Sequence, residues 1–235
     1  MKIFVINPNT STSMTDHLRR ELMKIKRPET NLTVVCPDKG PYSIESAYDE
    51  AISIPPTLEL VKKANQEGHE AVVIACFSDP GLRAAREISQ IPVIGIEEAS
   101  LHMAAMLGAR FSIMTPRKER IAAKREEVHA RGLDYFLASV RSLDLSVAET
   151  NENPEKTKNR ILEVATKAVE EDGAEVIILG CAGMAGYALE IEAKLKVKVV
   201  DPSSLALKLI EAMVQLGLTH SKIGLFSTPP EKPFK

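Results

Sequence analysis

The feature that most constrains the fold of this chain is an internal repeat. The segment GHEAVVIAC at 68–76 aligns without gaps with GAEVIILGC at 173–181, and each segment ends in a cysteine. Two flanking pairs of segments repeat at nearly the same offset: IFVINP and FSIMTP, at 3–8 and 111–116, and IPVIG and VKVVD, at 91–95 and 197–201. The chain therefore contains two versions of one unit of about a hundred residues.

Short apolar, β-branched runs of strand length recur along the chain. They lie at 3–6, 32–36, 71–75, 92–96, 111–114, 144–147, 176–179, 197–200 and 223–226. Helical spacing of apolar residues separates them, as in Met14, Leu18, Leu22 and Ile25. Runs that are apolar at every residue are typical of parallel strands covered on both faces. We therefore predict an α/β fold of two similar lobes, each a mainly parallel sheet flanked by helices. A pseudo-twofold axis would relate the lobes and place the active site in the cleft between them.

The repeat also predicts the domain organisation. Residues 1–98 form the first lobe and residues 99–205 the second, with the boundary between the two copies near residue 98. The segment 203–235 is longer than the second copy needs. We expect it to return to the first lobe, so that 206–235 completes that lobe.

Composition and charge exclude several classes of protein. The net charge of −2 and the lack of a basic run argue against a nucleic-acid partner. No apolar stretch reaches the roughly 20 residues of a membrane span, and the first apolar run stops at Asn7, too early for a signal peptide. Three cysteines are a sparse set for a disulfide scaffold. We expect a cytoplasmic protein with a small-molecule substrate, and a homo-oligomer in which the segment with Met103 and Met106 joins lobes or subunits.

The two repeated cysteines, Cys76 and Cys181, each directly follow a predicted strand. Ligands of parallel α/β sheets bind beyond the carboxyl ends of the strands, where the following loops lie. Asp79 and Pro80 have the types of an N-cap and a first helical residue, which predicts a helix just after Cys76. A helix N-terminus would make a thiol easier to ionise than its reference pKa of about 8.5. The glycines of GCAGMAG after Cys181 would let backbone N–H groups approach a ligand.

Two like residues that face each other across a cleft suit one chemistry directly. Racemisation at a carbon acid needs a base on one face and an acid on the other, with the roles exchanged in the reverse direction. Other interpretations of the cysteines remain open: small buried side chains, or a redox disulfide between Cys76 and Cys181. Cys36 has no partner in the repeat, which favours a buried packing role for it.

No metal or cofactor is expected from the sequence. None of the five histidines has zinc-site spacing to a cysteine or to another histidine. The glycines at 180, 183 and 186 are spaced three apart, unlike the dinucleotide fingerprint G-x-G-x-x-G, and no lysine is placed for a Schiff base.

Five motifs in order give the chain a family resemblance. They are INPNTS (6–11), GPYSIES (40–46), ACFSDPGL (75–82), VIGIEEA (93–99) and LGCAGMA (179–185). Together they resemble the hydantoin racemase family of the aspartate/glutamate racemase superfamily, from residue 3 to about residue 230. The resemblance implies two α/β lobes, a substrate held between them, no cofactor, and Cys76 and Cys181 as the catalytic residues.

The resemblance also implies substrate-binding residues in four loops. They are Asn9, Thr10 and Ser11 in the opening loop, Phe77 and Ser78 in the first cysteine loop, Thr115 on the opposite wall, and Ala182, Gly183 and Met184 in the second cysteine loop. Other roles remain open for several of them. The opening-loop residues have the types that cap a helix, Thr115 is equally suited to a turn, and Ser78 to supporting its loop.

One departure from the superfamily bears on the substrate. Its amino-acid racemases typically carry Cys-Asn-Thr at the first catalytic cysteine, whereas here Phe77 and Ser78 follow Cys76. A less polar, ring-shaped substrate fits this loop better. We expect a cofactor-independent racemase of 5-monosubstituted hydantoins or allantoin. The alternatives are an aspartate/glutamate-type racemase, a related decarboxylase or isomerase, and a non-catalytic small-molecule binding protein.

Overall fold

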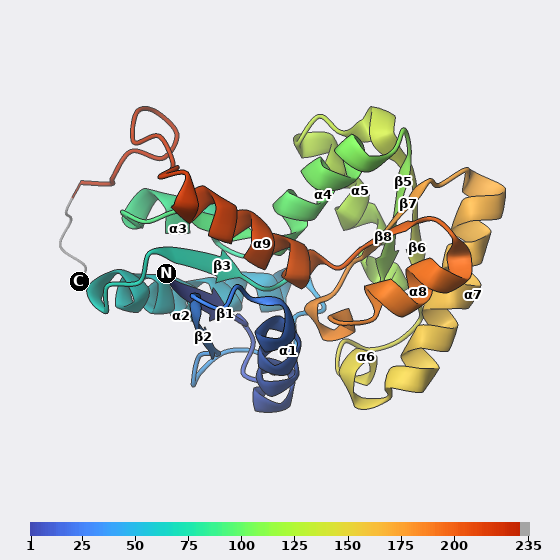
Figure 1. The fold of residues 1–235 in the computed structure, drawn as a ribbon, viewed down its shortest axis with the longest axis horizontal. Coiled ribbons are helices and arrows are strands. Elements are labelled where there is room, and N and C mark those ends of the chain that lie inside the picture. The colour runs from blue at the N-terminus through green and yellow to red at the C-terminus, as the bar shows by residue number, and fades with distance from the viewer. Residues whose placement is uncertain (231–235) are drawn as a thin grey trace.

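The computed structural model describes residues 1–230, which form two four-stranded parallel sheets of the same topology (Figure 1). The strand order is β2-β1-β3-β4 in the first sheet and β6-β5-β7-β8 in the second. The strands are β1 (Lys2–Ile6), β2 (Asn31–Val35), β3 (Ala71–Ile74), β4 (Val93–Gly95), β5 (Phe111–Thr115), β6 (Leu137–Ser142), β7 (Val176–Leu179) and β8 (Lys198–Val200). The predicted α/β fold of two similar lobes is confirmed.

Helices alternate with the strands along the chain. They are α1 (Thr12–Ile25), α2 (Ala47–Gln66), α3 (Leu82–Ile88), α4 (Ile96–Leu107), α5 (Ile121–Ala130), α6 (Glu149–Glu152), α7 (Pro154–Asp172), α8 (Ala188–Leu195) and α9 (Pro202–Gln215), with 3₁₀ turns η1 (Lys118–Arg120), η2 (Asp134–Phe136) and η3 (Ala182–Met184). In α1, the predicted apolar positions Met14, Leu18 and Leu22 are buried. None of the described helices is long and apolar enough to cross a bilayer.

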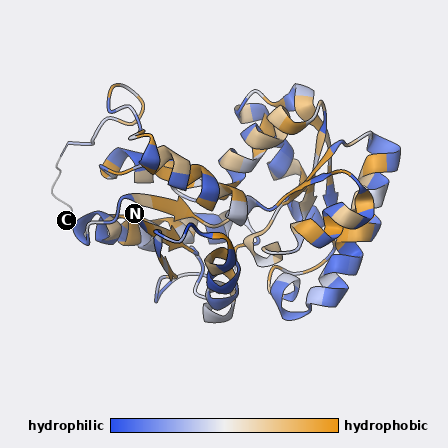
Figure 2. Ribbon diagram, in the orientation of Figure 1, coloured by the Kyte–Doolittle hydropathy of each residue, from blue (hydrophilic) through white to orange (hydrophobic). Residues whose placement is uncertain are grey.

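The central strands β3, β5 and β7 are buried at every residue, and β3 and β7 are apolar throughout. Figure 2 shows these strands as hydrophobic ribbons between helices with more hydrophilic outer faces. Burial of each Val, Ile or Leu side chain contributes about 1.5–3 kcal/mol relative to leaving it exposed. The two sheet cores therefore stabilise the strands whose carboxyl ends carry the cysteine loops.

Two helices are exchanged between the lobes. Helix α4 follows β4 of the first sheet but packs on β7 and β8 of the second, whereas α9 follows β8 and packs on β3 and β4 of the first. The two helices also pack against each other (Figure 1). This exchange ties the lobes together and supports the proposed domain limits, 1–98 with 206–235 and 99–205, which remain a prediction.

The segment after α9 lies along the edge of the first sheet. The Nε2 atom of His220 is 2.9 Å from the backbone nitrogen of Val93 in the edge strand β4. The Lys222 Nζ donates to the Arg86 carbonyl at 2.6 Å. Residues 231–235 of the expected 206–235 return lie outside the described residues.

Two strand predictions are wrong. The run at 144–147 follows β6 rather than forming a strand itself, because Asp144 has a positive φ of 53° that breaks the extended chain. The run at 223–226 is irregular, and Ile223 is 90% exposed. Apolar composition alone favoured a strand at both places, but neither run pairs with a sheet in the described structure.

The first cysteine loop is held by a carboxylate that caps a helix from another part of the chain. Asp79 accepts hydrogen bonds from the backbone N–H groups of Glu97 and Glu98, at 2.9 and 2.8 Å, in the first turn of α4. The N-cap position of α4 is Gly95, which has no side chain to cap it. The prediction that Asp79 caps a helix starting at Pro80 is therefore wrong, since α3 starts only at Leu82.

The second lobe makes the same connection, but its aspartate lies at the start of the helix and not in the cysteine loop. Here the carboxylate is at the helix cap, where Asp201 accepts from the N–H groups of Ser203 and Ser204 in α9. Its other oxygen accepts from the backbone N–H of Gly186, at 2.8 Å, in the loop after Cys181. In both lobes a single aspartate thus joins the cysteine loop to the N-terminus of the exchanged helix.

This connection predicts the effect of Gly95→Ala. A Cβ at position 95 would overlap the Asp79 carboxylate, although the backbone there, with φ −101° and ψ 150°, accepts any residue. We expect a loss of about 2 kcal/mol in the free energy of unfolding, from overpacking and the loss of the cap. Urea denaturation measures it. In an Asp79→Ala background, Gly95→Ala should lower the free energy of unfolding much less. An equal loss of this free energy in both backgrounds would contradict the account.

Candidate active site

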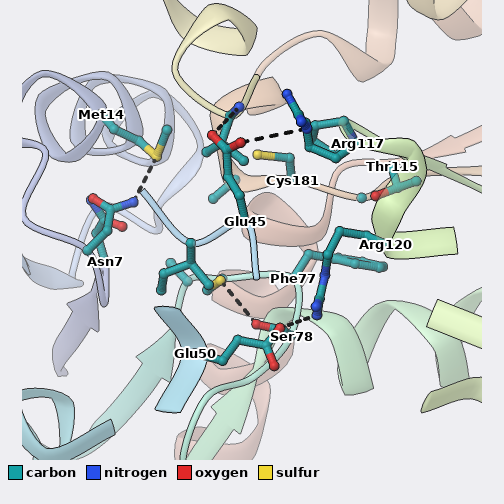
Figure 3. Close-up of a pocket in the computed structure, with 18 of the residues that line it drawn as sticks. Asn7, Met14, Glu45, Glu50, Phe77, Ser78, Thr115, Arg117, Arg120 and Cys181 are labelled. Atoms are coloured by element: carbon teal, nitrogen blue, oxygen red, sulfur yellow. Dashed lines mark hydrogen bonds and ion pairs between the residues drawn. The ribbon is translucent and has the colours of Figure 1, made fainter. Parts of the chain in front are cut away.

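One pocket is lined by both cysteine loops and lies between the two sheets (Figure 3). From the first lobe it takes Asn7, Asn9, Met14, Ile44, Glu45, Glu50, Ala75, Cys76, Phe77 and Ser78, and from the second Thr115, Pro116, Arg117, Arg120, Lys124, Val147, Gly180, Cys181 and Ala182. Its cavity volume is about 50 Å³, room for a few water molecules.

The two thiols each have a hydroxyl neighbour. The Cys76 sulfur lies 3.4 Å from Oγ of Ser78, two residues further along the same loop. The Cys181 sulfur accepts the backbone N–H of Gly183 at 3.4 Å and lies 3.8 Å from Oγ1 of Thr150, in α6. All three cysteines have free thiols, so the redox disulfide is not formed.

Burial dominates the ionisation of both thiols. It raises the pKa of Cys76 to about 12, against the lowering effects of the Ser78 hydroxyl and of the Lys124 charge. It also raises the pKa of Cys181, against the Gly183 N–H and the Thr150 hydroxyl. The expectation that a helix N-terminus eases ionisation of these thiols is wrong, because desolvation outweighs every local donor.

A buried lysine from the second lobe lies against the first cysteine loop. Lys124 in α5 is 3% exposed, and its Nζ donates to the carbonyl oxygen of Phe77, the residue after Cys76. The same Nζ donates to Glu97 at 2.9 Å and to Glu127 at 2.6 Å, and lies 5.3 Å from the centre of the Phe77 ring. The cation thus fixes the position of the loop across the boundary between the lobes.

Two ion pairs between the lobes flank the pocket (Figure 3). Glu45 lies 3.8 Å from Arg117 and accepts the backbone N–H of Val147 at 3.0 Å. Glu50 of α2 pairs with Arg120 of η1. Both arginines in the pocket wall are therefore already neutralised by carboxylates of the opposite lobe.

The structure brings seven of the eleven predicted site residues to this pocket. They are Asn9, Cys76, Phe77, Ser78, Thr115, Cys181 and Ala182. Within residues 1–230, no group of three or more His, Cys, Asp or Glu side chains is arranged to hold a metal ion.

Four predicted residues do not line the pocket. Ser11 caps α1 by accepting the N–H of Met14 at 3.2 Å, and Thr10 lies 3.3 Å from the carbonyl of Pro41. Gly183 directs its N–H at the Cys181 sulfur, and Met184 is fully buried in the core. The capping interpretation of the opening loop thus holds for Ser11, while Asn9 reaches the pocket.

Several residues of the site were not predicted. Asn7 and Glu45 lie inside the quoted motifs INPNTS and GPYSIES, so their motifs were available as a signal. Arg120 and Lys124 follow the β5 edge that repeats the β1 edge, which was a weaker signal. Thr150 reaches Cys181 from 31 residues away, and no local pattern marks it.

Comparison with known proteins is consistent with this arrangement. Residues 3–210 match the family model described as Asp/Glu/Hydantoin racemase. A hydantoin racemase of Pseudomonas sp. (strain NS671) is 41% identical over 234 residues, covering 100% of this chain and 94% of the relative.

Solved structures with the same fold include two allantoin racemases. The one from Klebsiella pneumoniae is 39% identical with a TM-score of 0.96, over 100% of this chain and 96% of its own. The one from Pseudomonas fluorescens is 32% identical with a TM-score of 0.94, over 100% of both chains. The chain therefore belongs to the hydantoin racemase family, a group of isomerases within the Asp/Glu/hydantoin racemases.

Proposed function

We propose that this protein racemises 5-monosubstituted hydantoins, including allantoin, by proton transfer between Cys76 and Cys181 without a cofactor. The observation that carries the proposal is that one thiol from each lobe lines a single pocket. They are close enough that the charge of Cys181 raises the pKa of Cys76. Because two thiolates in one pocket would repel each other, the favoured reactive state has one thiolate and one thiol. A two-base racemase needs this combination.

The proton transfer follows from that state. The thiolate removes the proton from the stereogenic ring carbon, and the electron pair moves onto the neighbouring carbonyl as an enolate. The other thiol then donates its proton to the opposite face of the carbon. After one turnover the two cysteines have exchanged protonation states, so the enzyme can then convert the opposite enantiomer.

The enolate oxygen needs hydrogen-bond donors. Each pKa unit between the carbon acid and the thiol adds about 1.4 kcal/mol to the proton transfer. The backbone N–H groups of Phe77 and Ser78, beside Cys76, donate to no acceptor in the described part of the chain. One well-placed donor contributes about 3–4 kcal/mol. The backbone N–H groups of Asn9 and Ala182, which also line the pocket, have no acceptor among the described residues either. We therefore assign the enolate to donors from these three loops.

The charges of the pocket favour a neutral ring over an acidic amino acid. Arg117, Arg120 and Lys124 are each paired with carboxylates of the protein. To pair with one of these cations, an α-carboxylate substrate would have to displace its carboxylate partner. A hydantoin ring requires no such exchange.

Serine variants of the two cysteines test the proposal. We expect Cys76→Ser and Cys181→Ser each to lower racemisation at least about 100-fold, because serine is a far weaker acid and base. Exchange of the ring C–H with D₂O should fall unequally for the two enantiomers, with opposite preference in the two variants. Proton NMR of both enantiomers of 5-benzylhydantoin and allantoin measures this. Cys36→Ser is the matched control, and wild-type racemisation by either pocket variant would contradict the mechanism.

The raised thiol pKa predicts a pH dependence. Since the pKa of Cys76 is about 12, its thiolate fraction increases about tenfold per pH unit between pH 7 and 10. We expect kcat/KM for the enantiomer that Cys76 deprotonates to rise with pH over this range, after subtraction of enzyme-free exchange. A flat profile would contradict the assignment of Cys76 as the base.

Lys124 should influence the same profile, because its charge lowers the pKa of Cys76. In Lys124→Met we expect the alkaline rise to shift to higher pH, with kcat/KM at pH 8 reduced about tenfold. Lys62→Met removes an exposed lysine of α2 and serves as the control for net charge. Circular dichroism checks that both variants are folded, and identical pH profiles for the two would exclude this role of Lys124.

A further inference from the structure

A buried hydrogen-bond acceptor without a partner lies in the pocket wall. Asn7 directly follows β1 and is 1% exposed, and its side-chain oxygen Oδ1 has no partner in the described structure. Among residues 1–230, the other buried side-chain atoms without a partner belong to His69, Glu97 and Ser203, none of which lines the pocket. A buried acceptor that stays unpaired is costly, so a donor in the pocket, from water or from a bound ligand, has to complete it.

The orientation of the Asn7 amide is determined by its neighbours. Its Nδ2 donates to Oδ1 of Asn9 at 2.8 Å and to Oγ1 of Thr15 at 2.9 Å. Both are acceptors here, since Oδ1 of Asn9 already accepts the Ser11 N–H and the Thr15 hydroxyl donates to the Ser11 carbonyl. Reversing the amide would set an oxygen against two acceptors, so Oδ1 has to be the unpaired atom.

Sheet register places Asn7 beside the first catalytic loop. Ile6 of β1 pairs with Ile74 of β3, so Asn7 and Cys76 lie one and two residues beyond paired positions on neighbouring strands. Neighbouring strands are about 4.8 Å apart. Asn7 and Cys76 also line the same pocket, so a ligand group that reaches Asn7 enters the pocket of the Cys76 thiol.

We propose that Asn7 Oδ1 accepts a hydrogen bond from a ring N–H of the substrate and thereby orients the ring for proton transfer with Cys76. An amide oxygen can pair only with a donor, so it selects an N–H or O–H group. In a hydantoin the nitrogen next to the stereogenic carbon carries such a proton, two bonds from the carbon that reacts. The choice of a ring N–H rests on the proposed function, whereas the need for a donor does not. The oxygen is buried in the pocket wall, so we expect this wall to shift when the ring binds.

The test compares 5-benzylhydantoin with its 1-methyl and 3-methyl derivatives, which each lack one ring N–H. With wild type we expect kcat/KM to fall at least about tenfold for one methylated compound, since a buried acceptor then loses its donor. In Asn7→Leu, kcat/KM for 5-benzylhydantoin should fall about tenfold, whereas kcat/KM for the methylated derivative that wild type disfavours should change little. The variant would then no longer prefer the compound with the N–H group.

Thr15→Val is the matched control. It removes a partner of the Asn7 Nδ2 but leaves Oδ1 in place, and it should keep the wild-type preference for N–H. An undiminished preference in Asn7→Leu at both ring nitrogens would overturn the proposal. Equal kcat/KM of wild type for all three compounds would also overturn it, and this measurement does not depend on the folding of a variant.

Failure of the Asn7 proposal can be distinguished from failure of the racemase proposal. If wild type exchanges no hydantoin proton, the racemase proposal fails, and the acceptor is then tested by calorimetric titration with the same three compounds. The same tenfold pattern in Kd would support a donor-accepting role for Asn7. No difference between wild type and Asn7→Leu in binding any of them would exclude it.

Discussion

Removal of water from the two thiols is the constraint on which the rest of the site depends. Burial raises the pKa of both Cys76 and Cys181, and the charge of Cys181 further raises that of Cys76. The protein counters this with specific groups: the Ser78 hydroxyl and Lys124 for one thiol, the Gly183 N–H and Thr150 hydroxyl for the other. A buried thiolate with few donors is a strong base, which suits abstraction of a weakly acidic C–H proton.

Such a site requires the two lobes to be fixed relative to each other. The exchange of α4 and α9 places a helix from each half of the chain on the sheet of the other. Asp79 and Asp201 then join each cysteine loop to the N-terminus of one exchanged helix. Lys124 adds a direct contact from the second lobe to the loop of Cys76. The position of each thiol therefore depends on how the two lobes pack, although the residues that make these contacts differ between the two halves.

Much of this architecture could be predicted from the repeat. The nearly constant offset identified the equivalent strands, and the carboxyl-edge rule for parallel sheets indicated that Cys76 and Cys181 would both lie at a binding edge. What failed depended on contacts between distant segments. Asp79 has the sequence signature of a local cap, but the N–H groups it bonds are 18 and 19 residues away. The runs at 144–147 and 223–226 have strand composition, but pairing with a neighbouring strand decides strand formation, and composition does not contain it.

The same reason explains the unpredicted site residues. Thr150 and Lys124 act on the two thiols across 31 and more residues, and periodicity does not record such contacts. Asn7 lies in a recognised motif, but its role follows from its side-chain oxygen. The amide nitrogen donates to Asn9 and Thr15, and the oxygen has no partner in the described structure. That conclusion needs a complete account of the surrounding hydrogen bonds.

The central claim, that two thiols act on opposite faces of one carbon, is tested most directly by following where solvent deuterium enters during racemisation in D₂O. At low conversion, mass spectrometry of the separated enantiomers of 5-benzylhydantoin should find deuterium in the product and protium in the remaining substrate, because a different thiol supplies the new proton. Product that retains its original protium would show that one base acts on both faces and would contradict the account.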